Sequence, residues 1–251
     1  MSDMFSLLGR VAIVTGANAG IGQGIAVALA VAGADIAAVG RSEPAETGAR
    51  VRAAGRRFVA IQADLGSAAR CPEIIQQVIE QLGSVDILVN NAGMIRRGEA
   101  LEFSEADWDA VLNVNLKSAF FLAQAAARHM VARGRGKIIN IASMLSFQGG
   151  IRVASYTASK SGIAGITRLL ANEWAAQGVN VNAIAPGYIA TRNTAALSSD
   201  ESRNREILGR IPAGRWGVPE DLGGAAVFLA SSASDYVHGA ILPVDGGWLA
   251  R

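Results

Sequence analysis

The chain has 251 residues, of which 51% are hydrophobic and 18% are charged, and its formal net charge at pH 7 is +2. A chain this apolar can bury a large core, which excludes intrinsic disorder, and its length fits one α/β domain. The basic residues are scattered, so no nucleic-acid partner is indicated. The longest apolar run, residues 24–34, is far shorter than the ~20 residues of a membrane span. The single cysteine, Cys71, excludes a disulfide framework, and we expect a cytoplasmic protein.

Short apolar segments alternate with longer helical patterns along the whole chain. Strands that are apolar throughout are typical of a parallel sheet covered on both faces. The alternation predicts a single-domain, Rossmann-like, doubly wound parallel sheet of about seven strands flanked by helices. The expected strands are residues 11–15, 35–39, 58–62, 86–90, 137–141, 180–185 and 241–244. The expected helices are residues 22–32, 45–54, 69–82, 105–130, 156–176 and 219–229.

The least regular segment spans residues 188–215, shortly before the last expected helix. A long, poorly patterned segment in a compact domain is often a lid over a substrate. We therefore expect a mobile substrate loop here, within one domain that spans residues 1–251. A helical insertion on the surface is the alternative.

A glycine-rich turn, residues 15–22 with the sequence TGANAGIG, joins the first expected strand to its helix. Glycines let the backbone approach a phosphate, and the start of a helix offers unpaired N–H groups. This position predicts a dinucleotide site, and the absence of a Lys-Ser/Thr pair after the glycines argues against a P-loop NTPase. The predicted cofactor residues of this turn are Gly16, Asn18, Gly20, Ile21 and Gly22.

The end of the second expected strand bears on the choice of cofactor. A site that prefers NAD commonly has a carboxylate there, whereas this chain has Gly40 followed by Arg41. Because an arginine suits a 2′-phosphate, the sequence favours NADP(H) over NAD(H), with Arg41 as a surface residue stacked on adenine as the alternative. Asp64, beside Leu65, can accept a hydrogen bond from the adenine amino group or cap a helix.

Tyr156 and Lys160 are four residues apart at the start of an expected helix, so their side chains share one face. A phenol, with a pKa of ~10, is a poor acid or base at neutral pH. A neighbouring ammonium favours the phenolate, so we expect Lys160 to lower the pKa of Tyr156 and create a general acid–base. Ser143 follows the strand at 137–141, and its hydroxyl can meet Tyr156 at the carboxyl edge of the sheet.

Taken together, these segments resemble the short-chain dehydrogenase/reductase family. The matching motifs are TGxxxGxG at 15–22, NNAG at 90–93, NVNL at 113–116, Ser143, YxxxK at 156–160 and PG at 186–187, in the family's order. The resemblance implies an NAD(P)-dependent oxidoreductase in which Tyr156 exchanges a proton and Lys160 also holds the nicotinamide ribose. It implies that Ser143 orients the substrate oxygen and that Asn115 anchors a water leading to Lys160. It further implies self-association, usually as a homotetramer, and cofactor contacts from Asn91, Ala92, Gly93, Pro186, Gly187, Ile189 and Thr191.

Within that family, the chain is most similar to members that act on deoxy sugar acids, through residues 95–97, 142–152, 211–217 and 244–251. A sugar-acid carboxylate requires a cation or several N–H donors. Three arginines lie near segments expected at the mouth of the cleft, and a surface or interface ion pair is the alternative role for the first two. The predicted substrate residues are Ser143, Tyr156, Gln148, Arg96, Arg152 and Arg192.

Other functions stay open. A reductase of 3-oxoacyl thioesters, or another polyol or gluconate dehydrogenase, is the alternative within the family. A catalytically silent nucleotide sensor is the alternative from a different class. His129 and His238 are far apart and lack ligand spacing, so no metal site is expected. Trp174, Trp216 and Trp248 can stack on sugar, although packing in the interior or at an interface is favoured.

Overall fold

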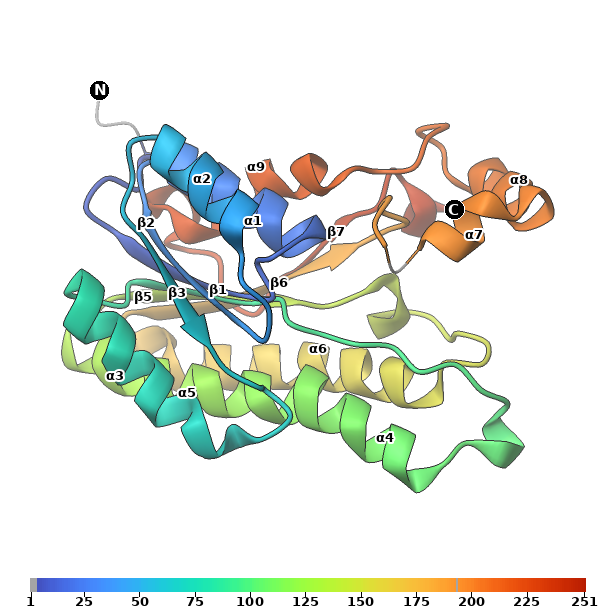
Figure 1. Cartoon of the computed structure of the whole chain (residues 1–251), viewed down its shortest axis with the longest axis horizontal. Helices are drawn as coiled ribbons and strands as arrows, with labels where there is room; N and C mark the ends of the chain where they lie inside the picture. Colours follow the sequence, from blue (N-terminus) through green and yellow to red (C-terminus); the bar gives the residue numbers. More distant parts are fainter. Residues whose placement is uncertain (1–3, 193) are drawn as a thin grey trace.

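In the residues that the computed structural model describes, 4–192 and 194–251, seven parallel strands form one sheet in the order β3-β2-β1-β4-β5-β6-β7 (Figure 1). From β1 the chain adds β2 and β3 on one side of the sheet and then returns to add β4 to β7 on the other side of β1. This change of side between β1 and β4 is the doubly wound topology that the sequence predicts. The fold class is therefore confirmed. The strands are β1 (Val11–Thr15), β2 (Asp35–Gly40), β3 (Phe58–Gln62), β4 (Ile87–Asn90), β5 (Gly136–Ile141), β6 (Val179–Pro186) and β7 (Ile241–Val244).

Helices cover both faces of the sheet. Helices α1, α2 and α9 pack on one face, and α3, α4, α5 and α6 pack on the other (Figure 1). Every residue of β1, β4 and β6 is buried, as expected of strands that helices cover on both faces. The buried polar residues Asn180 and Asn182 of β6 donate hydrogen bonds to backbone carbonyls. The helices are α1 (Gly20–Val31), α2 (Ala45–Ala53), α3 (Cys71–Leu82), α4 (Glu105–Leu112), α5 (Ser118–Ala132), α6 (Ala154–Trp174), α7 (Ala195–Ser199), α8 (Glu201–Arg210) and α9 (Gly223–Ala230).

The single helix expected at 105–130 is divided. A π-helix, Asn113–Lys117, separates α4 from α5. Its wider turn carries Asn115, whose side chain is 2% exposed and bonds to the backbone of Met94. The stretch expected at 105–130 is helical throughout, but it is not one regular α-helix, and no glycine or proline marks the change.

The segment 188–215 is largely helical in the structure, since it contains α7 and α8. Asp200 caps α8 by accepting hydrogen bonds from the backbone N–H groups of Ser202 and Arg203, each at 3.0 Å. Ile207 and Ile211 are buried in a small cluster with Met144 and Trp248. The segment thus packs beside the loop that follows β5. No helix in the described part of the chain is long and apolar enough to cross a membrane.

Candidate active site

The glycine turn between β1 and α1 is tightly built. Gly16 has φ of +66°, and a Cβ at Gly22 would overlap the carbonyl oxygen of Gly16 and the side-chain amide of Asn91. Within the described chain, no side chain caps the N-terminus of α1, where Ala19 occupies the capping position. The first N–H groups of α1 are therefore available to a bound phosphate group.

The motif at the end of β4 holds this turn in place. The Asn91 side-chain amide donates to the carbonyl oxygens of Thr15 and Gly16, at 2.8 and 3.2 Å. The Thr15 hydroxyl accepts from the backbone N–H groups of Asn91 and Ala92, at 2.9 and 2.8 Å. Asn91 thereby acts as a brace between neighbouring strands, a role that the motif alone does not reveal.

A pocket opens beside the turn, at the carboxyl ends of β2 and β3, where the adenosine end of a dinucleotide is expected. Its lining includes Asn18 and Gly40, together with Ser42 and Glu43, which sequence reasoning missed. Arg41 is exposed beside these residues, and its carbonyl oxygen accepts a hydrogen bond from the Gln62 side chain at 3.1 Å. The signal for Ser42 and Glu43 was their place directly after the strand.

Asp64 and Leu65 differ in their surroundings. Leu65 is buried in the core, whereas Asp64 is exposed just after β3. The Asp64 carboxylate accepts a hydrogen bond from the backbone N–H of Gly66 at 2.9 Å, so it closes a turn rather than capping a helix.

The candidate catalytic residues come together at the ends of β5 and α6. Ser143 follows β5 and is buried, and its side chain lies close enough to that of Tyr156 to act on the pKa of the phenol. Lys160 is only 4% exposed, and its ammonium lies 5.7 Å from the centre of the Tyr156 ring. The same ammonium donates a hydrogen bond to the Ile141 carbonyl at 2.6 Å. The structure thus places Ser143, Tyr156 and Lys160 in one cluster.

Burial dominates the electrostatics of this cluster. It raises the pKa of Tyr156 above its ordinary value, while the hydrogen bond from Ser143 and the charge of Arg97 act in the opposite direction. Burial also lowers the pKa of Lys160 to about 8. The expected lowering of the Tyr156 pKa by Lys160 is not seen in the protein alone, where burial raises that pKa and the groups that act against the rise are Ser143 and Arg97. At neutral pH Tyr156 carries its proton and can donate it.

Asn115 connects the loop after β4 with α6. Its side-chain oxygen accepts from the Met94 N–H at 2.8 Å, and its amide donates to the Met94 carbonyl at 2.9 Å and to the Ser159 hydroxyl at 3.1 Å. Ser159 in turn donates to the Tyr156 carbonyl at 2.8 Å. These bonds fix the backbone that carries Tyr156, and the water-anchoring role of Asn115 stays a prediction.

The loop after β6 closes the other side of the cleft. Pro186 is the last residue of β6, and the Gly187 N–H donates to the Val244 carbonyl at 3.0 Å. A Cβ at Gly187 would lie 2.6 Å from the Cα of Asp245, so only glycine fits here. Farther along, Ile189 is buried, and the Thr191 methyl lies 3.4 Å from where a Gly20 Cβ would be. This loop therefore returns to the glycine turn.

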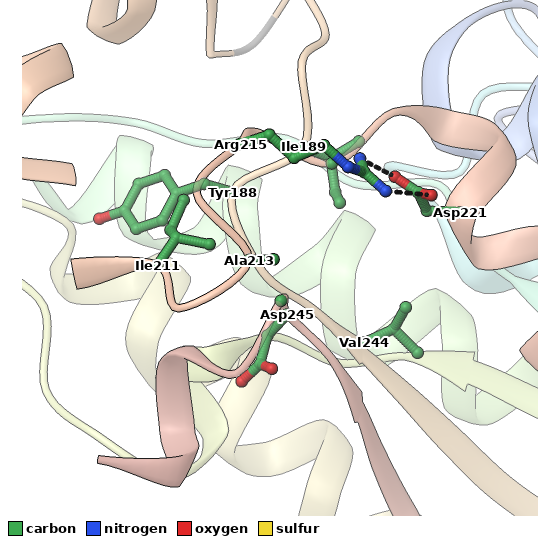
Figure 2. Close-up of a pocket in the computed structure, with 10 residues that line it drawn as sticks. Tyr188, Ile189, Ile211, Ala213, Arg215, Asp221, Val244 and Asp245 are labelled. Carbon is green, nitrogen blue, oxygen red and sulfur yellow. Dashed lines mark hydrogen bonds and ion pairs between the residues drawn. The ribbon is translucent and has the colours of Figure 1, made fainter. Parts of the chain in front are cut away.

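A second pocket lies behind this loop (Figure 2). Ile189, Ile211 and Val244 line it, and a two-bond ion pair between Arg215 and Asp221 lies at one side, at 2.7 and 2.9 Å. This ion pair lowers the pKa of Asp221 to about 2. Residues of the loop after β6, of the segment 211–221 and of the end of β7 line this pocket together.

The predicted substrate arginines have other partners. Arg96 pairs with Asp107 at 3.1 Å, and Arg152, which has φ of +61°, pairs with Glu99 at 3.0 Å. These are the surface ion pairs that the sequence left as the alternative, and Arg192 is exposed.

Arg97 is the cation that sequence reasoning missed. Its charge acts to lower the pKa of Tyr156, and the structure places it, exposed, in the irregular loop after β4, next to Arg96. The available signal was its place in the segment 95–97, which is among those that resemble the family members acting on deoxy sugar acids.

Comparisons with known proteins agree with this geometry. A family model described as enoyl-(acyl carrier protein) reductase matches residues 16–249. The 2-dehydro-3-deoxy-D-gluconate 5-dehydrogenase of Escherichia coli K12 is 63% identical over 248 residues, which cover 98% of each chain. The chain belongs to the short-chain dehydrogenase/reductase family. The predicted family is thus confirmed, and its members are NAD(P)-dependent oxidoreductases.

Solved structures of this short-chain dehydrogenase/reductase family extend the agreement to three dimensions. A protein from Agrobacterium tumefaciens with bound NADP is 59% identical, has a TM-score of 0.94, and matches over 99% of this chain and 100% of its own. The gluconate 5-dehydrogenase of Burkholderia cenocepacia, in complex with NADP and tartrate, is 42% identical with a TM-score of 0.95 over 99% and 98%.

The residues present fit a nicotinamide dinucleotide of the kind this family uses. The uncapped start of α1 suits the pyrophosphate, and the glycine positions leave room where a Cβ would intrude. The pocket beside β2 suits the adenosine, and the loop from Pro186 to Thr191 faces the glycine turn across the cleft.

Proposed function

We propose that this chain is a dehydrogenase of deoxy sugar acids, of the 2-dehydro-3-deoxy-D-gluconate 5-dehydrogenase or 2-deoxy-D-gluconate 3-dehydrogenase type. The observation that carries the proposal is the cluster of Ser143 and Tyr156 beside the buried ammonium of Lys160, which lies 5.7 Å from the centre of the Tyr156 ring. This cluster suits the interconversion of a keto and a hydroxy group. The 63% identity with the Escherichia coli enzyme supports the substrate class.

In this proposal the nicotinamide ring, when bound, supplies or takes up the hydride at the substrate carbon. Tyr156 is protonated at neutral pH and donates its proton to the carbonyl oxygen during reduction, and it accepts that proton during oxidation. Ser143 donates a second hydrogen bond to the same oxygen as negative charge develops. Lys160 holds the nicotinamide ribose, and its charge favours the phenolate once Tyr156 has lost its proton.

For the substrate carboxylate we propose Arg97 in preference to Arg96 and Arg152. Arg97 takes part in no ion pair among residues 4–192 and 194–251, whereas the other two are paired with carboxylates. Arg97 also acts on Tyr156, which places its charge near the reacting group. Gln148, in the loop after Ser143, is the proposed partner of a further substrate oxygen.

The alternative substrate is a 3-oxoacyl thioester, and the description of the matching family model names an enzyme of another acyl thioester, an enoyl-(acyl carrier protein). A rate matrix decides between the two. NADPH and NADH are each offered with deoxy-keto-aldonates, with gluconate-derived keto acids and with acetoacetyl thioesters, and absorbance at the nicotinamide band is followed. We expect the deoxy-keto-aldonates to give the highest kcat/KM, and faster thioester turnover would contradict the proposal.

The variant Tyr156→Phe is the negative control for this assay, because it lacks the hydroxyl that donates the proton. It removes only the hydroxyl, so we expect kcat to fall by about 10²- to 10⁴-fold while cofactor binding persists. Near-wild-type turnover would refute the role of Tyr156. Cofactor binding without turnover of any substrate by the wild type would favour the nucleotide sensor.

We propose NADP(H) as the preferred cofactor, because Arg41 is exposed beside the pocket at the end of β2. A hydrogen bond to a charged group contributes about 1.5–3 kcal/mol, or roughly 10- to 150-fold in affinity. Arg41→Ala should weaken NADPH binding by about that factor and leave NADH nearly unchanged, as measured by fluorescence titration. Arg52→Ala, which removes an arginine stacked over Phe58, is the control. Equal losses for both cofactors would exclude Arg41 as the phosphate reader.

We further propose that the protein acts in the cytoplasm as a homo-oligomer, most simply a homotetramer. Trp108, Phe121 and Leu169 support this, since each is at least 38% exposed on α4, α5 or α6. Large apolar side chains in one exposed layer are typical of an association surface.

A further inference from the structure

The short C-terminal turn carries a buried tryptophan. Trp248 is 4% exposed, and its ring centre lies 4.8 Å from that of Tyr188. The guanidinium of Arg210, the last residue of α8, lies 3.9 Å from the centre of the indole. Trp248 therefore packs against the helical segment 188–215 of its own chain rather than facing solvent.

Several hydrogen bonds hold this turn in position. The Asp245 carboxylate accepts from the N–H groups of Gly247 and Leu249, each at 2.9 Å. In Figure 2 this carboxylate points away from the ion pair of Arg215 and Asp221. The Arg251 side chain donates to the Gly209 carbonyl at 2.5 Å. The indole of Trp248 is thus fixed from both sides.

The indole makes one polar contact, with the loop that begins at Ser143. Its N–H donates to the side-chain oxygen of Gln148 at 3.2 Å. An indole N–H can only donate, so the amide oxygen of Gln148 must face Trp248 and the amide NH₂ must face away. In the described part of the chain, this NH₂ group donates to no protein acceptor, although Gln148 is half-buried.

We propose that Trp248 is a positioning residue that fixes Gln148 as a hydrogen-bond donor toward an acceptor oxygen of the sugar acid. The inference rests on the proposed function, since it states how the same site reads its substrate. Without the indole, the amide can turn over and present its oxygen instead. That oxygen would repel a carboxylate or keto oxygen, so substrate binding would weaken.

Trp248→Phe separates the hydrogen bond from the packing, because it keeps an aromatic ring against Tyr188 and Arg210. Trp216→Phe is the matched control. Trp216 packs against the same Tyr188 at 5.3 Å, but its indole donates to Asn204 of α8 at 2.8 Å and not to Gln148. Both variants lose one indole hydrogen bond near the helical segment. Only Trp248→Phe removes the hydrogen bond that holds the Gln148 amide.

The kinetic test measures KM and kcat for the sugar acid. We expect Trp248→Phe to raise KM about fivefold, with kcat and the cofactor KM within about twofold of the wild type. Gln148→Ala should raise KM at least as much, and adding Trp248→Phe to it should change nothing more. Additive effects of the two changes, or an equal rise in Trp216→Phe, would overturn the proposal.

A second measurement needs no substrate. We expect the indole proton of Trp248 to exchange with solvent at least about tenfold faster in Gln148→Ala than in the wild type, while that of Trp216 is unchanged. Unchanged exchange at Trp248 would refute the hydrogen bond itself. If the Trp248 indole proton exchanges faster in Gln148→Ala but the wild type turns over no sugar acid, the hydrogen bond stands and the proposed function is refuted. The proposed contact between Gln148 and the substrate is then refuted as well.

Discussion

Lys160 is a charged group that the fold keeps in an apolar interior. Its ammonium has a hydrogen bond to the Ile141 carbonyl, and burial lowers its pKa from 10.5 to about 8. Between those two values the unfolded chain binds more protons than the folded one. The free energy of unfolding therefore rises with pH across this window, and the penalty for the buried charge is largest below pH 8.

This penalty can be measured against Lys160→Met, which removes the charge. The free energy of unfolding of the wild type, minus that of Lys160→Met, should rise by up to about 3 kcal/mol between pH 8 and 10.5. Urea unfolding at several pH values tests this. The exposed residue Lys117 provides the control variant Lys117→Met, which should show no such rise. A pH-independent difference for Lys160→Met would show that its ammonium is not destabilised by burial.

At this scale the sequence located the reacting groups but not their energetics. Spacing brought Tyr156 and Lys160 to one helix face, and family order added Ser143. The direction of the Tyr156 pKa shift depends on how much water the folded chain excludes, which no spacing encodes. In the same way, the sequence does not distinguish Arg96 from Arg97. Only the fold shows that Arg96 forms the ion pair with Asp107.

Among the elements, the turn at the start of α1 has no room for a side chain at Gly22. Alanine is a better helix former than glycine by about 1 kcal/mol, so propensity alone predicts that Gly22→Ala stabilises α1. The added methyl would instead overlap the Gly16 carbonyl and the Asn91 amide. The brace between β1 and β4 would then shift.

We expect Gly22→Ala to lower the free energy of unfolding by about 1–3 kcal/mol and to weaken cofactor binding at least tenfold. Chemical denaturation and a cofactor titration measure the two effects. Gly224→Ala in α9 is the control, because no atom lies within 4 Å of the added methyl. Wild-type affinity in Gly22→Ala would mean that the turn tolerates the methyl and does not shape the phosphate site.

Element boundaries were predictable where a local signal exists. The strands β1, β3 and β7 begin and end as predicted, and the other strands differ by one residue at one or both ends. Helix α8 was not predicted, although Asp200 is a typical N-cap residue, because its polar sequence shows little apolar periodicity. The π-helix has no local signal such as a glycine or a proline, and its residue Asn115 makes its hydrogen bonds with the distant backbone of Met94.

For the whole molecule, the sheet order follows from strand–helix alternation, but association depends on which side chains stay exposed. Phe121 is 38% exposed on α5, within the helix layer that includes α4 and α6 (Figure 1). Val31 is 73% exposed on α1, on the opposite face of the sheet. The two positions therefore report on different faces.

Phe121→Glu should shift the protein to a smaller assembly, because burying a phenylalanine contributes about 1.5–3 kcal/mol per copy. Val31→Glu should leave the mass unchanged. Light scattering coupled to size-exclusion chromatography measures both. A wild-type protein that elutes as a monomer at micromolar concentration would refute the proposed oligomer.

The π-helix between α4 and α5 also constrains how this chain can change. One residue of a helix corresponds to a rotation of about 100°. The π-helix Asn113–Lys117 absorbs one such residue without that rotation, so deleting a single residue there would restore a regular helix with α5 still against the sheet, but would remove the wider turn that carries Asn115. Surface loops absorb insertions and deletions readily, whereas this stretch must keep its length for Asn115 to meet Met94. Variation there is limited to substitution.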